Sequence, residues 1–307
     1  MADDPPTPAR AEPSGLLLGF AAVAAAAALW AVSAVVARRL FDGGVDPVEL
    51  TESRAVLAAV GFALVPGAWR RPARKGWGHI GAMGFALALV NATYYVAISR
   101  IPVAVALVVQ YTAPALIVGW TSAVSRRAPA RDVVVALVAA LVGVVLVVDL
   151  TPAAIDRIDG VGVAIALASA VFFASYTVLA ERTGAVYGST GAMFRGFVVA
   201  SVLWAAYQVP RGLPEMLWER ANVPEVLYVG LAGTLAPFFL FAWGVRRVRA
   251  ERAAIVATLE PVIAAAVAWA WLGQHLSGLQ VAGGSLVVGA VISLQARRRE
   301  PLVAPEM

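Results

Sequence analysis

Glu260 is the one acidic residue near the middle of a long apolar stretch, and a proline follows it. If that stretch crosses a bilayer, an ionised carboxylate there costs at least about 2.5 kcal/mol, so such residues usually face a cavity and bind a proton, an ion or a cationic group. Pro261 has no N–H and displaces the carbonyl of Ala257, which is left free to accept another bond. We therefore predict that Glu260 binds substrate and couples to protons. The alternative is a protonated, purely structural side chain.

A second proline, Pro114, lies inside an apolar stretch earlier in the chain. It should release the carbonyl of Gln110 in the same way, and the Gln110 side chain adds an amide. The position that corresponds to Glu260 is occupied by Ala113, so one stretch can bind an ionic group and the other a neutral one. We predict that Gln110 contacts the substrate, with a hydrogen bond between helices as the alternative.

Other side chains at mid-depth are aromatic rings, amides or hydroxyls. Asn91 and Tyr94 are three residues apart and would share one face of a helix. Such groups suit an amphipathic cavity for small amphipathic metabolites, although packing against lipid or neighbouring helices is the alternative for each. The further residues predicted to bind substrate are Trp30, Ser33, Asn91, Tyr94, Tyr176 and Phe241.

Two arginines, Arg54 and Arg195, lie inside apolar stretches and close to one end of each. Long cationic side chains in such positions can extend towards water. We predict structural or gating roles for both, and for Pro114 and Pro261; direct contact of the arginines with a substrate carboxylate is the alternative. For Arg54 we expect a partner either in Glu49 or on another helix.

The elements that must position these residues are membrane-spanning helices. The chain has 307 residues, of which 61% are hydrophobic and 14% charged, and its mean hydropathy is +0.79. Soluble domains contain about a quarter charged residues, so soluble, disordered and disulfide-scaffold classes are excluded. The predicted fold is an all-α membrane protein with ten transmembrane helices, at Gly15–Ala37, Val48–Trp69, His79–Ile98, Val103–Val124, Asp132–Leu150, Val161–Ala180, Thr190–Val209, Val226–Val245, Ala253–Gly273 and Leu279–Ala296.

Basic residues are unevenly distributed between alternate connecting loops. With the N-terminus placed inside, 16 of the 24 Lys and Arg residues fall in inner loops or tails, 6 in outer loops and 2 within helices. An excess of Lys and Arg marks the cytoplasmic side, so both termini should be cytoplasmic and the number of spans even. We expect a multi-pass protein of the cell (inner) membrane. This topology explains the net charge of +5 without nucleic-acid binding.

The two halves of the chain resemble each other. A shift of 147 positions aligns Ala97–Pro114 with Gly244–Pro261, and a shift of 141 aligns Arg54 with Arg195. Each unit holds five spans, so the second copy must enter the membrane with opposite polarity, as two inverted five-helix repeats that suit alternating access. The predicted divisions are a disordered N-terminal tail 1–14, a first repeat 15–150, a second, inverted repeat 160–296 and a cytoplasmic tail 297–307.

Three stretches carry motifs of a known family. The first two predicted helices contain ALWAVSAVVAR and LTESRAVLAAV, and the last two contain TLEPVIAAAVAWAWLGQHLSGLQVAGGSLVVGAVI. On these motifs the chain resembles the EamA-like ten-helix branch of the drug/metabolite transporter superfamily. The resemblance implies secondary transport, commonly export of amino acids, related metabolites or toxic compounds. Gln274 stands where the family often has glutamate, so a role for that acid is not carried over.

Enzymatic chemistry has no support in the residue types present. The chain has no cysteine and two histidines, both at span ends, which excludes thiol catalysis and histidine-based metal sites. Its single lysine, Lys75, precedes Gly76, so no phosphate-binding loop with Gly-Lys-Ser/Thr exists. We expect neither an enzyme nor a bound metal or cofactor.

These observations predict a secondary transporter that exports small amphipathic metabolites by alternating access, with amino acids as the first expectation. One alternative is an exporter of organic cations or drugs that uses Glu260 as the counter-charge. Another is a membrane receptor or subunit that transports nothing. The expected partners are a small-molecule substrate, the lipid bilayer and protons. A monomer and a homodimer both remain open.

Overall fold

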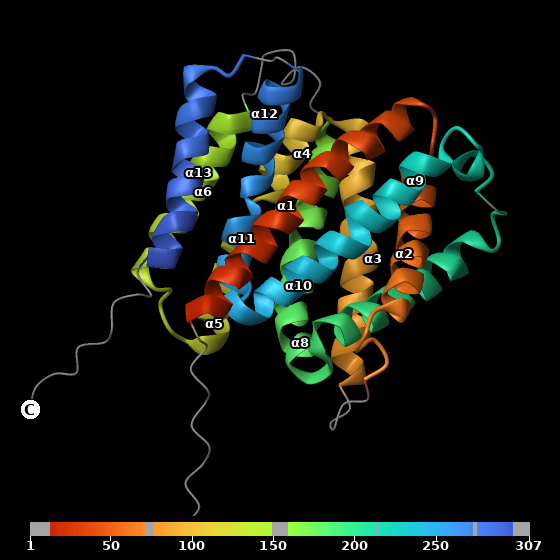
Figure 1. Cartoon of the computed structure of the whole chain (residues 1–307), viewed down its shortest axis with the longest axis horizontal. Coiled ribbons are helices and arrows are strands. Elements are labelled where there is room, and N and C mark those ends of the chain that lie inside the picture. Colours follow the sequence, from red (N-terminus) through yellow and green to blue (C-terminus); the bar gives the residue numbers. More distant parts are fainter. Residues whose placement is uncertain (1–12, 71–75, 149–158, 213, 273–274, 297–307) are drawn as a thin grey trace, which may run out of the picture.

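The computed structural model describes residues 13–70, 76–148, 159–212, 214–272 and 275–296. All regular secondary structure in these segments is helical (Figure 1). The predicted tails, apart from the two residues that begin α1, lie outside the described residues, as does Gln274. The elements are α1 (Pro13–Asp42), α2 (Pro47–Leu64), α3 (Trp77–Arg100), α4 (Val103–Gln110), α5 (Ala113–Ser125), α6 (Arg131–Val148), α8 (Gly160–Gln208), η1 (Met216–Trp218), α9 (Val223–Gly230), η2 (Leu231–Leu235), α10 (Ala236–Val248), α11 (Ala250–Ala257), α12 (Leu259–Leu272) and α13 (Gly278–Ala296).

Seven helical segments in the described part of the chain are long and apolar enough to cross a membrane. The prediction of ten differs at three places. α2 carries three charged side chains within 18 residues, α8 runs through 49 residues where two spans were predicted, and the ninth predicted span is divided between α11 and α12. The all-α fold with several membrane-crossing helices is therefore confirmed.

Two of the apolar stretches are broken into pairs of shorter helices. Tyr111 and Thr112 separate α4 from α5, and Thr258 separates α11 from α12. Pro114 and Pro261 fall in the first turn after each break, where a residue needs no hydrogen-bond donor. Tyr111 and Thr258 lie 147 positions apart, which is the shift that aligns the two halves in sequence.

Two further irregularities shape the helices around the bundle. Gly188 interrupts α8 with φ 73° and ψ 162°, a backbone conformation that side-chain-bearing residues rarely adopt. It separates a helical part 160–187 from a second part 189–208. Between α9 and α10 the chain forms the π-helical stretch η2, and such stretches in other proteins are frequent at functional sites.

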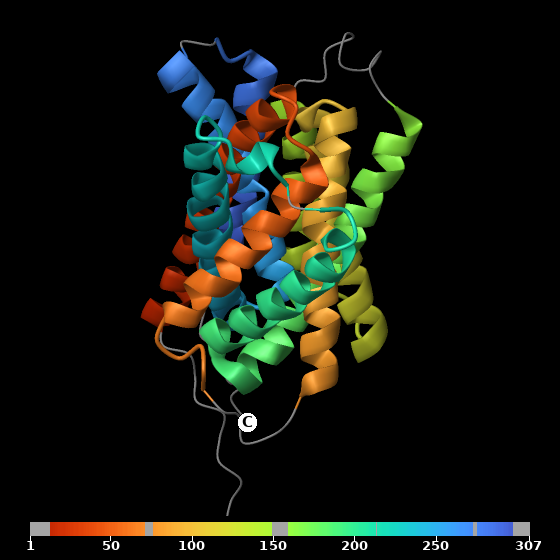
Figure 2. The same ribbon diagram turned by 90° about the vertical axis from the view of Figure 1, so that its right-hand side faces the viewer.

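The helices form one bundle in which elements distant in sequence lie side by side. α3 packs along α8, α1 along α10, and α6 along α13 (Figures 1 and 2). α6 and α13 form a pair at one edge, where a Cβ on Gly143 or on Gly283 would lie 2.7 Å from the carbonyl oxygen of the other residue. The first turn of α1 and the last turn of α13 lie on the same side of the bundle (Figure 1).

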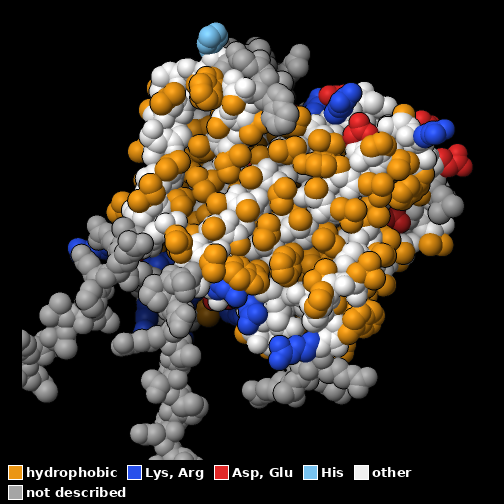
Figure 3. All heavy atoms as spheres, in the orientation of Figure 1, with side chains coloured by type: hydrophobic (Ala, Val, Ile, Leu, Met, Phe, Trp, Pro, Cys, Tyr) orange, Lys and Arg blue, Asp and Glu red, His pale blue; other side chains and the backbone are white. Residues whose placement is uncertain are grey.

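The surface of the bundle is largely apolar. In Figure 3 hydrophobic side chains cover the broad middle of the visible face, while Lys and Arg gather at its lower edge and charges of both signs at its upper right. Val35, Val60 and Val135 are 66%, 59% and 66% exposed. An apolar surface of this extent would drive aggregation in water but is the natural surface for contact with lipid.

Candidate functional site

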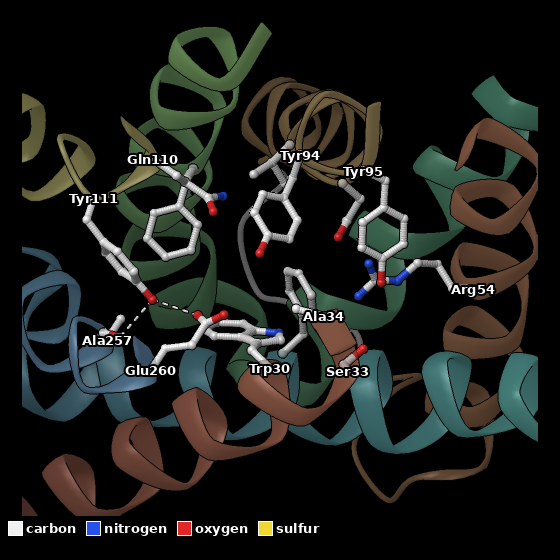
Figure 4. A pocket seen from close by; sticks show the side chains of 14 residues that line it. Trp30, Ser33, Ala34, Arg54, Tyr94, Tyr95, Gln110, Tyr111, Ala257 and Glu260 are labelled. Atoms are coloured by element: carbon white, nitrogen blue, oxygen red, sulfur yellow. Dashed lines mark hydrogen bonds between the residues drawn. The ribbon is translucent and has the colours of Figure 1, made fainter. Parts of the chain in front are cut away.

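A cavity lies between α1, α2, α3, α4, α8, α10 and the break of α11 and α12 (Figure 4). The volume of the cavity that is open to water is about 50 Å³. A single water needs at least about 10–15 Å³ of such space, so water fits in the cavity, but the cavity is narrow in this conformation. The lining residues are Trp30, Ser33, Ala34, Arg54, Val90, Asn91, Tyr94, Tyr95, Gln110, Tyr111, Phe173, Phe238, Ala257 and Glu260.

At one end of the cavity the carboxyl group of Glu260 is buried against a tyrosine. Tyr111 Oη lies 2.6 Å from Glu260 Oε2 and 3.0 Å from the carbonyl oxygen of Ala257. Glu260 is 7% exposed, and none of the ion pairs found in the described part of the chain includes it. The Ala257 carbonyl is the one that Pro261 releases from the helix, and the structure supplies a hydroxyl to it.

At the other end Arg54 is held by the second half of the chain. It is 4% exposed; its Nε donates to Thr234 Oγ1 at 2.6 Å and its Nη2 to the Gly233 carbonyl at 3.1 Å. The guanidinium carbon lies 4.6 Å from the ring centre of Tyr95. Pro237 lies four residues after Gly233, so it cannot supply the N–H that would occupy this carbonyl in a regular helix. The partners of Arg54 are thus on another helix, one of the two alternatives left open by the sequence.

Polar groups from α3 and α4 lie between the two ends. The Tyr94 hydroxyl points into the cavity (Figure 4) and has no hydrogen-bond partner among the described residues. Asn91 Nδ2 donates to the carbonyl of Leu87 on its own helix at 2.7 Å. Gln110 Nε2 donates to Ser169 Oγ on α8 at 3.0 Å. Gln110 therefore both lines the cavity and links two helices, which combines the two alternatives that the sequence offered.

Aromatic rings form one wall of the cavity. Trp30 meets the ring of Phe173 at 6.2 Å and that of Phe238 at 5.3 Å between centroids. Tyr176 and Phe241, which we predicted to bind substrate, do not line the cavity. They lie one turn beyond Phe173 and Phe238 on α8 and α10, and their rings pack on each other at 5.8 Å. The cavity-lining ring of Phe173 packs against both, with its centroid 6.1 Å from that of Tyr176 and 5.6 Å from that of Phe241, so both support the wall instead of lining the cavity.

Arg195 lies away from the cavity. Its Nη1 donates to the Ala68 carbonyl at 2.9 Å and to the Gly191 carbonyl at 3.0 Å, and its Nη2 donates to the Arg70 carbonyl at 3.0 Å. Its guanidinium carbon lies 5.0 Å from the ring centre of Tyr187. These bonds fasten the chain that follows α2 to the second part of α8, a geometry suited to the structural or gating role predicted for it.

Most of the residues predicted to bind substrate come together in the cavity, and one important neighbour was missed. Tyr111 was not predicted; its only signal in the sequence is its place directly after Gln110, where Pro114 breaks the helix. Pro114 and Pro261 do not line the cavity but set the two breaks beside it. The predicted residues that line it are Trp30, Ser33, Asn91, Tyr94, Gln110 and Glu260.

The arrangement brings an acidic and a basic side chain into one cavity. One carboxyl group and one guanidinium share a narrow space with aromatic walls and neutral hydrogen-bonding groups, which suits a small molecule of mixed polarity. Within the described segments no group of three His, Asp or Glu side chains is placed to hold a metal ion.

Comparisons with known proteins agree with a membrane transporter. The family model described as EamA-like transporter family matches residues 17–149 and 160–294. The threonine/homoserine exporter RhtA of Salmonella typhimurium is 25% identical over 221 residues, 72% of each chain. RhtA of Escherichia coli strain K12 is 25% identical over 210 residues, which cover 68% of this chain and 67% of its own.

Two further likenesses extend this result. An uncharacterized transporter of Archaeoglobus fulgidus is 26% identical over 205 residues, covering 66% of this chain and 71% of its own. A protein of known crystal structure superposes with a TM-score of 0.68 over 94% of this chain and 99% of its own, at 20% identity. At that identity the likeness shows a shared fold.

Proposed function

The chain belongs to the EamA-like transporter family, and on this premise we propose that it is a secondary exporter of small amino acids. The observation that carries the proposal is the pairing of opposite charges in one cavity, with Glu260 at one end and Arg54 at the other (Figure 4). An amino acid carries an ammonium and a carboxylate. Its ammonium would lie at Glu260 and its carboxylate would be directed towards Arg54, so that each buried charge gains an opposite partner.

The size and polarity of the space between these ends favour a small, hydroxylated side chain. A cavity volume of about 50 Å³ leaves little room for a bulky drug without movement of the wall. The unpartnered hydroxyl of Tyr94 and the amide of Gln110 offer neutral hydrogen-bonding groups. The relatives named threonine/homoserine exporters support threonine and homoserine as the first substrates to test.

We further propose that ten transmembrane helices form two inverted repeats, 15–150 and 160–296. The matches of one family model to residues 17–149 and 160–294 support this division, as do the two helix breaks 147 positions apart. In this arrangement Gly188 separates the sixth helix from the seventh, and α11 with α12 forms the ninth. Five helices per repeat give the halves opposite polarity, which suits alternating access to one central cavity.

Cytoplasmic termini complete the proposed topology. The described ends of α1 and α13 lie on one side of the bundle (Figure 1), and the inner loops and tails of the predicted topology hold 16 of the 24 basic residues. An excess of Lys and Arg on that side supports a cytoplasmic location. Export then means that substrate enters from the side of the termini and leaves on the opposite side.

Protons are the proposed coupling ion, and Glu260 their site. The side chain is buried, belongs to none of the described ion pairs and lies in a cavity where water fits. The same observation favours a second candidate function, the export of organic cations with Glu260 as counter-charge. A cation would need Glu260 alone, whereas an amino acid would use Arg54 as well.

Counterflow exchange in proteoliposomes tests the proposal. Threonine and homoserine are compared with threonine methyl ester, which lacks the carboxylate, and with N-acetylthreonine, which lacks the ammonium. We expect exchange of the two amino acids and at least about tenfold slower exchange of both blocked forms, equivalent to about 1.4 kcal/mol for each missing contact. Exchange of the ester and other organic cations alone would establish the second candidate. No exchange by folded protein would favour the non-transporting receptor.

A further inference from the structure

The hydroxyl group of Tyr111 joins the two broken helices. Tyr111 itself lies in the break between α4 and α5, whereas its two acceptors, Ala257 and Glu260, flank the break between α11 and α12. The two oxygen–oxygen distances are 3.0 Å to the Ala257 carbonyl and 2.6 Å to Glu260 Oε2. A tyrosine hydroxyl has a single hydrogen, so it can donate to only one of these acceptors at a time.

We propose that Tyr111 is a positioning residue that changes its acceptor when Glu260 takes up a proton. With Glu260 ionised, the hydroxyl donates to the carboxylate. When a proton bonds to Oε2, the new O–H donates to Tyr111 Oη, and the tyrosine hydrogen turns to the carbonyl of Ala257. Tyr111 keeps its own hydrogen throughout, so no proton is lost or gained there. The inference rests on the proposed function only in making Glu260 the proton site.

This exchange of partners changes how the two halves are tied together. A buried carbonyl released by Pro261 costs free energy when it has no donor. In the ionised state Tyr111 binds the side chain of Glu260, and in the protonated state it also closes the backbone gap at the end of α11. Protonation at one atom therefore alters the contact between a helix break in the first half and a helix break in the second.

The other charged and titratable groups that line the cavity are few. They are Arg54 from α2 and Tyr94 and Tyr95 from α3; α1, α4, α8 and α10 contribute neutral side chains. Arg54 stays charged at any working pH and is engaged by Gly233 and Thr234. Glu260 is thus the carboxyl group of the cavity and the group whose charge changes when it takes up a proton, and Tyr111 is the residue bonded to it.

Infrared difference spectra of the full chain in lipid, acid minus neutral, test this without any substrate. We expect a carboxylic-acid band that is lost in Glu260→Gln. We also expect a backbone carbonyl band that moves when alanine carbonyls are labelled with carbon-13. In Tyr111→Phe the first band should persist at a shifted frequency and the second should disappear. Tyr94→Phe removes a hydroxyl from the same cavity and should leave both bands as in the natural protein.

Glu260→Asp provides a second variant in case Tyr111→Phe does not fold. It withdraws the carboxyl group from Tyr111 by one methylene, so it should keep a carboxylic-acid band and lose the alanine carbonyl band. Wild-type bands in Tyr111→Phe, or no Glu260 band in the natural protein, would overturn the inference. A normal spectral response without counterflow of any solute would instead reject the proposed function and leave the role of Tyr111 standing.

Discussion

Arg54 and Arg195 form reciprocal contacts between the two halves of the chain. Arg54, in the first half, donates to the Gly233 carbonyl of the second; Arg195, in the second half, donates to the Ala68 and Arg70 carbonyls of the first. The two arginines are also the pair that a shift of 141 aligns in sequence. Any motion of one half against the other must break or turn these bonds, so we expect both arginines to control it.

Replacing Arg54 with lysine should weaken both stability and transport. A lysine ammonium is a single point charge and cannot reproduce the fork that reaches Gly233 and Thr234 together. We expect Arg54→Lys to lower the free energy of unfolding by about 1–3 kcal/mol and to slow counterflow by at least about tenfold. The measurements are denaturant unfolding in detergent and exchange in proteoliposomes. Arg220→Lys, at an exposed position, is the control; equal behaviour of the two variants would refute this role.

Glu260→Gln should fold and lose the pH dependence of transport. Glutamine keeps the size of the side chain and an oxygen that can accept from Tyr111, so the contact at 2.6 Å has a neutral substitute. Because the amide does not titrate, the rate of exchange should be flat from mildly acidic to neutral pH. The measurement is counterflow across that range, with thermal unfolding as the check on folding. A slope equal to that of the natural protein would show that the coupling proton binds elsewhere.

An ion pair between the last residue of α3 and the residue that precedes α8 should make the stability of the fold depend on pH in acid. Arg100 Nε donates to Asp159 Oδ2 at 2.7 Å, and this bond, with further help from the backbone N–H groups of Val161 and Gly162, lowers the pKa of Asp159 below its ordinary value of 3.8. A carboxyl group with a lowered pKa stabilises the fold above that ordinary value, and the contribution is lost as the pH falls through the lowered pKa.

The variant Asp159→Asn isolates this effect, because asparagine can still cap α8 but has no charge. We expect the natural protein to melt at a higher temperature than the variant at neutral pH, and the two curves to converge as the pH falls below 3.8. In proteins that also carry Arg100→Gln, the difference in melting temperature between Asp159 and Asp159→Asn should be smaller at neutral pH. A difference in melting temperature that stays constant down to acid pH would contradict a role for the charge of Asp159.

The contact between α6 and α13 should tolerate no added methyl group. A Cβ on Gly143 or on Gly283 would lie 2.7 Å from the opposing carbonyl oxygen, so either alanine variant must push the helices apart. We expect Gly143→Ala and Gly283→Ala each to lower the free energy of unfolding by about 1–3 kcal/mol. Gly289→Ala on the same helix meets nothing within 4 Å and should be neutral or slightly stabilising. The measurement is the free energy of unfolding of the three variants. Equal values for Gly143→Ala, Gly283→Ala and Gly289→Ala would contradict a close contact between α6 and α13.

The sequence predicted the helical class and the carbonyls that the two prolines release, because both depend on local chemistry. It placed each proline inside an uninterrupted span, so the breaks between α4 and α5 and between α11 and α12 were not predicted. Long apolar runs require helices in a bilayer, and Pro114 and Pro261 cannot supply the N–H that a continuous helix needs. The carbonyl of Ala257 was expected to be released, and in the structure the Tyr111 hydroxyl, from the other helix break, lies 3.0 Å from it.

The contacts that a local pattern does not contain were harder to predict. Tyr111 was missed because its partner Glu260 lies 149 positions away, and an aromatic residue in an apolar run is indistinguishable from one that packs on lipid. Tyr176 and Phe241 were predicted to bind substrate because they lie at mid-depth in the membrane, yet they do not line the cavity and pack behind the ring of Phe173, which does. The depth of a residue in the membrane follows from its position along a span. The direction in which its side chain points depends on how that helix is rotated within the bundle, which the sequence does not show.

The glycine contact between α6 and α13 also has a mechanical meaning. Because a Cβ on either Gly143 or Gly283 would lie 2.7 Å from the opposing carbonyl oxygen, the backbones of these two helices are packed closely at this point. We therefore expect α6 and α13 to move as one unit. In the proposed transport cycle, the broken helices that carry Tyr111 and Glu260 would move relative to this pair.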